Sequence, residues 1–107
     1  MKPLAKSALP PKVRRSLTKL GQDLRTARLR RNVTVANLAE RAGVSPGTIL
    51  RLEQGNPGVG MGTLALALWL LGLNDRMMTL ADEGQDEIGS ALEVEQRRRR
   101  ARPRTSP

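Results

Sequence analysis

The segment from Val35 to Gly55 constrains the fold more than any other part of the sequence, because it carries the start and stop signals of two short helices in close succession. Thr34 can cap the first helix, and Gly43 gives the chain the conformational freedom that a tight turn needs. Ser45 followed by Pro46 is typical of a helix start, with a hydroxyl cap before a proline at the first helical position. This order of capped helix, glycine turn and capped helix predicts a helix-turn-helix.

Helical periodicity continues on both sides of this segment. Apolar residues recur at three-to-four spacing before it, and a run of leucine and alanine follows it, both typical of helices rather than strands. A fifth helix is expected to begin at Asp75, with Met77, Met78 and Leu80 turned inward. The sequence therefore predicts an all-α fold, a five-helix domain with helices near residues 15–31, 35–42, 46–54, 63–71 and 75–81.

Charge divides the 107-residue chain into distinct parts. Residues 1–31 carry a net +9, residues 32–74 are neutral, residues 75–95 carry −6 and residues 96–107 carry +6. We expect a flexible basic arm over residues 1–14, the helix-turn-helix domain over 15–81, and an acidic-then-arginine-rich tail over 82–107. Within that tail, residues 86–100 have helical propensity and form either a docked amphipathic helix or a segment that orders only when bound.

The composition excludes several classes of function. The chain has no cysteine and no histidine, so a thiolate metal site and the commonest general base are both missing. We therefore expect neither an enzyme nor a bound cofactor or metal. No apolar stretch approaches the roughly 20 residues of a membrane span, and no signal peptide is recognisable, so a soluble cytoplasmic protein is expected. Trp69 is the sole aromatic residue, which disfavours a single-strand or RNA binder, because such proteins stack bases on aromatic rings.

A net charge of +9 and the predicted motif together favour double-stranded DNA as the partner. Arg51 can pair with a guanine or clamp a phosphate, Thr48 can hold a phosphate, and Leu50 can pack on a thymine methyl. Pro46 and Gly47 offer little to read bases with, so phosphate contacts and DNA shape are expected to contribute much of the discrimination. The candidate DNA-contacting residues are Thr34, Ser45, Pro46, Gly47, Thr48, Leu50, Arg51 and Gln54.

These residues resemble the lambda repressor/Cro-like (XRE) DNA-binding family, chiefly through the runs Leu38–Ser45 and Leu52–Gly55 and through Arg28. The resemblance covers about residues 17–73. It implies a five-helix domain that binds operator DNA as a two-fold dimer, with the second helix of the motif in the major groove. It also implies a structural ion pair between Arg28 and Glu53. The chain departs from the family at Val35, where glutamine is usual, and at Pro46, where glutamine is frequent.

The C-terminal half is similar to the HipB-like antitoxins in Val59–Thr63, Leu71–Leu73, Leu80–Asp82 and Asp86–Gly89, which precede the charged tail. This likeness implies a partner, a HipA-like serine/threonine kinase toxin, and repression of the protein's own operon. The helix near residues 63–71 is apolar almost all round, and a small domain has one core, so a homodimer interface is expected to cover the remaining face. The candidate interface residues are Leu66, Trp69 and Leu70.

The arginine-rich end leaves three interpretations open. Arg97, Arg98, Arg99 and Arg100 can contact phosphates beside the DNA site, fold back on the acidic stretch before them, or dock on a protein partner. The N-terminal arm leaves the same choices. The function predicted from sequence is a sequence-specific repressor and antitoxin; the alternatives are a stand-alone XRE-type regulator or an interaction module that inhibits a partner enzyme.

Overall fold

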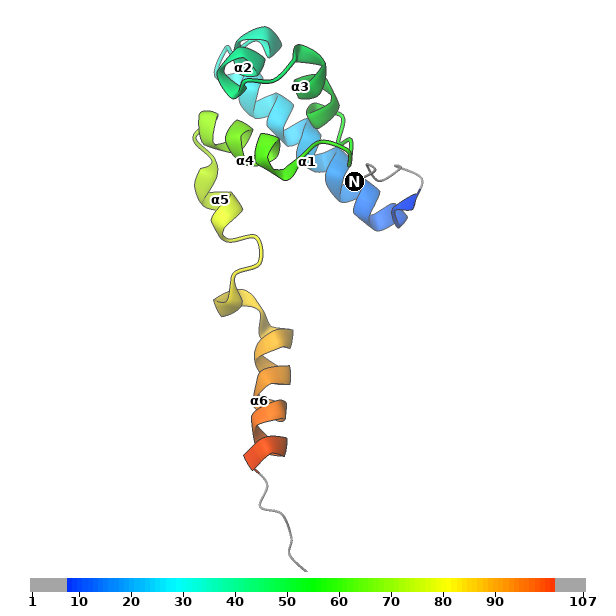
Figure 1. Ribbon diagram of the computed structural model, residues 1–107, viewed down its shortest axis with the longest axis vertical. Helices are drawn as coiled ribbons and strands as arrows, with labels where there is room; N and C mark the ends of the chain where they lie inside the picture. The colour runs from blue at the N-terminus through cyan, green and yellow to red at the C-terminus, as the bar shows by residue number, and fades with distance from the viewer. Residues whose placement is uncertain (1–7, 102–107) are drawn as a thin grey trace, which may run out of the picture. The chain divides into compact units, whose positions relative to one another are not determined.

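The computed structural model describes residues 8–101, and this part of the chain is all helical (Figure 1). Within these residues the chain contains no strand. The elements in chain order are α1 (Pro11–Arg30), α2 (Val35–Ala42), α3 (Pro46–Glu53), α4 (Met61–Leu70), α5 (Asn74–Met78), the 3₁₀ helix η2 (Glu83–Gln85) and α6 (Glu87–Ala101).

Helix α1 begins earlier than the sequence predicted, at Pro11 rather than at residue 15. Pro10 is the N-cap residue and Pro11 occupies the first helical position, where the N–H that proline lacks would have no intrahelical partner. The proline pair therefore starts the helix, and residues 11–14 are helical and not part of a flexible arm. The helix ends at Arg30, and Asn32 follows in the left-handed region at φ 52°.

The two helices of the motif are capped as the sequence predicted. The Thr34 hydroxyl accepts a hydrogen bond from the Asn37 backbone N–H at 3.0 Å, at the start of α2. Gly43 ends α2 at φ 69°, and the Ser45 hydroxyl accepts from the Thr48 N–H at 3.2 Å, at the start of α3. The caps satisfy backbone donors that would otherwise lack a partner, so both short helices have sharply defined starts.

Two clusters of apolar side chains form the core. One joins α1, α3 and α4 and consists of Leu24, Ala27, Leu52, Ala67, Leu68 and Leu71. The other lies between α2 and α3 and consists of Leu38, Ala39 and Ile49, with Leu70 of α4 packed against it. Ile49 is completely buried. Because α3 contributes to both clusters, its inner side packs against α1 and α2 (Figure 1), and it shares the first cluster with α4.

Helices α1 and α3 approach each other at two glycines. A Cβ built on Gly21 would lie 2.5 Å from the carbonyl oxygen of Glu53, and one built on Gly55 would lie 2.5 Å from that of Leu17. Real Cβ atoms do not come so close to backbone oxygens, so only glycine allows this spacing. Gly55 also has φ 74°, a conformation that glycine adopts without cost.

The chain divides into two compact units after Met77. Met77 packs against the first core cluster, as expected, but Met78 and Leu80 are 75% and 74% exposed, so the prediction that they face inward is wrong. Helix α5 ends at Met78. It is therefore too short to place residue 80 on the same inward face as Met77. The structure thus closes the first unit four residues before the predicted boundary at residue 81.

The second unit contains η2 and α6, which contact each other. The Asp86 side chain accepts a hydrogen bond from the Gly89 N–H at 2.9 Å, in the first turn of α6. Farther along, Glu93 pairs with Arg97, and Glu95 pairs with Arg99 at 3.3 Å. The apolar side chains Ile88, Leu92 and Val94 are exposed. Local capping and ion pairs therefore support α6, whereas burial of its apolar side chains does not.

Candidate DNA interface

Helix α3 has one buried face and one exposed face. Ile49, Leu52 and Glu53 are buried, while Arg51 and Gln54 are exposed and Leu50 is 48% exposed. The exposed set is the one that the sequence assigned to the DNA side. Since α3 is held from behind by the core, its outer surface has the form that a helix needs to enter a major groove.

The Arg51 side chain is held by a network of hydroxyl groups at the start of α3. Its Nη2 donates to the Thr48 hydroxyl at 3.0 Å, and that hydroxyl is in turn 3.0 Å from the hydroxyl of Ser45. Ser45 is itself fixed as the N-cap. The guanidinium is therefore tied through two side chains to the helix terminus, and Thr48 is engaged with Arg51 in the free protein.

Gly47 lies one turn before Arg51 on the same face of α3. A Cβ built on Gly47 would lie 3.4 Å from Nη1 of Arg51, an ordinary van der Waals contact, so the arginine runs back along the helix past this position without requiring a glycine there. The sequence interpretation gave Thr48 a phosphate and missed its hydrogen bond with Arg51. The signal was the spacing, since residues three and four apart on a helix share a face.

Arg28 and Glu53 form a buried ion pair between α1 and α3. Arg28 donates from Nε to Oε2 of Glu53 at 2.7 Å and from Nη2 to Oε1 at 3.0 Å, while Nη1 donates to the Val33 carbonyl oxygen at 2.9 Å. The two residues are only 6% and 8% exposed. Hydrogen bonding to Glu53 raises the pKa of Arg28 above its ordinary value, against the opposing effect of burial. The guanidinium thus stays charged and fixes the end of α3 to α1.

The remaining candidate residues lie apart from this network. Thr34 is exposed and acts as the cap of α2, and Pro46 is exposed at the first position of α3. On α4, Trp69 is 62% exposed, whereas Leu66 and Leu70 are half-buried. The four arginines Arg97, Arg98, Arg99 and Arg100 lie in the last turns of α6, in the second unit, and all four are exposed.

Among residues 8–101, no helix is both long enough and apolar enough to span a membrane. In the same part of the chain, no group of three or more acidic, histidine or cysteine side chains is placed to bind a metal. The contacts around α3 are those of a capped, rigidly supported helix with a basic side chain on its outer face.

Of the comparisons with known proteins, the one with protein families agrees with this geometry. Neither a curated protein nor a solved structure matches the chain. The model of the family described as "Helix-turn-helix domain" matches residues 19–80, more than half of the chain, and this range covers α2, the turn at Gly43 and α3. The chain belongs to the helix-turn-helix domain family, which supports an XRE-like DNA-binding protein and a role in transcription regulation.

Proposed function

We propose that the protein is a sequence-specific transcriptional repressor that binds operator DNA as a homodimer, with α3 in the major groove. The observation that carries this proposal is the position of Arg51, exposed on the outer face of α3 and fixed by Thr48. A guanidinium with a fixed plane suits bidentate pairing to the O6 and N7 atoms of guanine, which is the commonest base-specific contact. Leu50 and Gln54 flank it and can meet a thymine methyl or an adenine edge.

The dimer is proposed from the surface of α4. Trp69 is a large aromatic side chain left mostly exposed, and Leu66 beside it is half-buried. Aromatic anchors of this kind are enriched at the centre of protein interfaces. Leu70 contributes less of its surface, because it already packs against the core cluster between α2 and α3. A two-fold dimer would present two copies of α3 to successive turns of the major groove.

Replacing Arg51 by alanine tests the DNA proposal. We expect binding to the promoter upstream of the protein's own gene to weaken by about 5- to 150-fold, because one bidentate base contact is worth about 1–3 kcal/mol. A gel-shift titration measures this, and we expect two chains per bound site. Arg41, exposed on α2, supplies the control, since Arg41→Ala makes the same change in charge. Equal weakening by both variants would contradict a specific role for Arg51.

Two substitutions at Thr48 separate positioning from phosphate binding. Thr48→Ser keeps the hydroxyl that accepts from Arg51, whereas Thr48→Val removes it and keeps the side-chain shape. If Thr48 acts through Arg51, the valine variant loses discrimination between the promoter and an unrelated duplex, and the serine variant retains it. A phosphate contact would instead weaken binding to both duplexes alike.

A second candidate function, binding of a protein partner, is favoured by the second unit. Ile88 of α6 is 76% exposed and Leu92 is also exposed one turn later, so they form an apolar strip on a helix whose other side chains are mainly charged. Helices with such strips bind apolar grooves. The HipB-like likeness makes a HipA-like serine/threonine kinase the proposed partner, the protein then being its antitoxin.

Copurification with the product of an adjacent kinase-like gene tests the partner. We expect the full-length chain to retain that protein, and Ile88→Glu/Leu92→Glu to release it, because charge on an apolar interface costs several kcal/mol in desolvation. Promoter binding should persist in the variant, since residues 88 and 92 lie outside the unit that contains α3. Retention of the partner by this variant would show that α6 does not bind it.

If Arg97 to Arg100 contact phosphates instead, their replacement reduces the salt dependence of DNA binding.

A further inference from the structure

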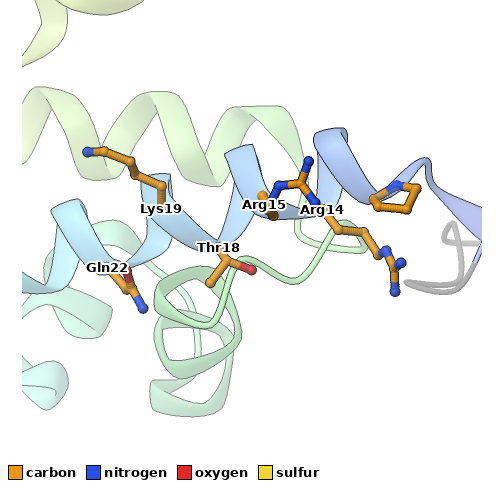
Figure 2. Close-up of a pocket in the computed structure, with 6 residues that line it drawn as sticks. Arg14, Arg15, Thr18, Lys19 and Gln22 are labelled. Carbon is orange, nitrogen blue, oxygen red and sulfur yellow. The ribbon is translucent and has the colours of Figure 1, made fainter.

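The outward face of α1 carries a line of polar and basic side chains that the candidate DNA interface on α3 does not include. Figure 2 shows Arg14, Thr18 and Gln22 on one edge of this face and Arg15 and Lys19 on the other. Together with Pro11 they line a shallow open depression of about 350 Å³. The spacing of three and four residues keeps them on one side of the helix, opposite to Leu20 and Leu24, which face the core.

This face, the α1 basic face, has an excess of positive charge. Lys19 pairs with Asp23 at 2.6 Å, and Asp23 is the one acidic residue between residues 8 and 30. Arg14 and Arg15 are exposed, and no carboxylate within residues 8–101 forms an ion pair with either of them. Adjacent like charges repel each other and favour an anion that neutralises both.

The α1 basic face lies next to the end of α3. A Cβ built on Gly55, the residue after Gln54, would lie 2.7 Å from the backbone nitrogen of Thr18. The outer face of α3 therefore borders α1 at Thr18. Arg14 lies one turn from Thr18 on the same edge (Figure 2). A duplex seated against α3 and continuing past Gln54 would meet this edge of α1.

The length and pattern of this face fit a nucleic-acid backbone. From Pro11 to Gln22 the helix rises by roughly 16 Å, the rise of about five successive phosphates on one strand. The depression that its cations line is open, and it is not an enclosed cavity of the kind that a compact anion would require. Since Trp69 of α4 is the sole aromatic residue of the chain, no ring lies beside these cations to stack bases of a single strand.

We infer that the α1 basic face binds phosphates of the DNA duplex outside the segment that α3 reads, with Arg14 and Arg15 as the principal contacts. This inference rests on the proposed function, because it extends the same DNA surface. On this inference, α1 contributes to the affinity for duplex DNA and lengthens the DNA segment that the protein covers. Base recognition remains with α3, since phosphates carry no sequence information directly.

The test compares two duplexes from the promoter upstream of the protein's own gene. The short duplex is limited to the segment that α3 reads. The long duplex is extended at each end by about ten base pairs, roughly one helical turn. Fluorescence anisotropy gives the affinity of wild type and of Arg14→Gln/Arg15→Gln for each. We expect wild type to bind the long duplex about tenfold more tightly than the short one. The variant should lose most of this advantage, and the slope of log K against log salt should fall by about two.

The control is Arg30→Gln/Arg41→Gln, which removes the same charge from exposed positions outside the α1 basic face. An equal loss in the control, or an unchanged length advantage in Arg14→Gln/Arg15→Gln, would overturn the inference. The inference would also be overturned if wild type bound a single strand of the same length as tightly as the long duplex, and if Arg14→Gln/Arg15→Gln weakened both to the same extent. Failure of the proposed function gives a different result, since Arg51→Ala would then leave the affinity for both duplexes unchanged. Thermal unfolding followed by circular dichroism verifies that each variant is folded.

Discussion

Replacing Glu53 by alanine is expected to lower the free energy of unfolding by about 3–5 kcal/mol, the usual result of removing one partner of a buried ion pair. The Arg28 guanidinium would keep its charge, because arginine is not deprotonated in proteins, and would stay almost fully buried without the carboxylate that now accepts two of its hydrogen bonds. Since domains of this size are stable by only about 5–15 kcal/mol, the change would remove a large fraction of the stability. Urea unfolding followed by circular dichroism measures the effect.

An exposed ion pair provides the control. Asp23→Ala removes the partner of Lys19, and both of those side chains are more than half exposed, so a change of under about 1 kcal/mol is expected. The double variant Arg28→Met/Glu53→Leu should recover much of the loss, because it removes both charges together. The recovery is incomplete, since the Val33 carbonyl loses the donor supplied by Arg28. A Glu53→Ala protein as stable as Asp23→Ala would refute the structural role of the pair.

Replacing Gly55 by alanine is expected to be the other strongly destabilising change. The residue has φ 74°, which costs about 1–2 kcal/mol for a residue with a side chain. The new methyl group would also meet the backbone of Leu17 at 2.5 Å, and backbone cannot move aside as a side-chain end can. Separating α1 from α3 to make room adds about 1–3 kcal/mol or more. Thermal unfolding of the variant measures the sum.

Gly43 is a matched control, because it shares the backbone conformation but not the crowding. Its φ is 69°, and nothing lies within 4 Å of a Cβ built on it. Gly43→Ala should therefore show the conformational cost alone, and the difference between the two variants measures the close approach of α1 and α3. Equal destabilisation by the two substitutions would contradict the contact at Leu17.

The sequence predicted the helix-turn-helix well because its signals are local. The hydroxyl caps at Thr34 and Ser45 and the turn at Gly43 act within four residues of the groups they satisfy, so their pattern is visible without any tertiary contact. The outer face of α3 follows from helical spacing in the same way. The family resemblance added Arg28 and Glu53, which are far apart in the chain and which no local pattern joins.

Other features depended on contacts that the linear sequence does not contain. The sequence predicts an arm through residue 14, although a proline such as Pro11 is equally suited to start a helix, and the outcome depends on whether residues 12–15 continue the helix. The burial of Met77 and the exposure of Met78 and Leu80 are set by where the first unit ends. The engagement of Thr48 with Arg51 depends on side-chain conformations, and the position of the α1 basic face beside α3 depends on the glycine contact.

One guanidinium, that of Arg28, joins three parts of the domain: it extends from α1, holds the carboxylate at the end of α3, and holds the Val33 carbonyl just before α2 begins. The mutual angle of the two motif helices is consequently set during folding, before any DNA arrives. In the proposed complex, association would then lose little internal entropy, and the binding free energy of each base contact would be retained as affinity instead of being consumed in ordering the protein.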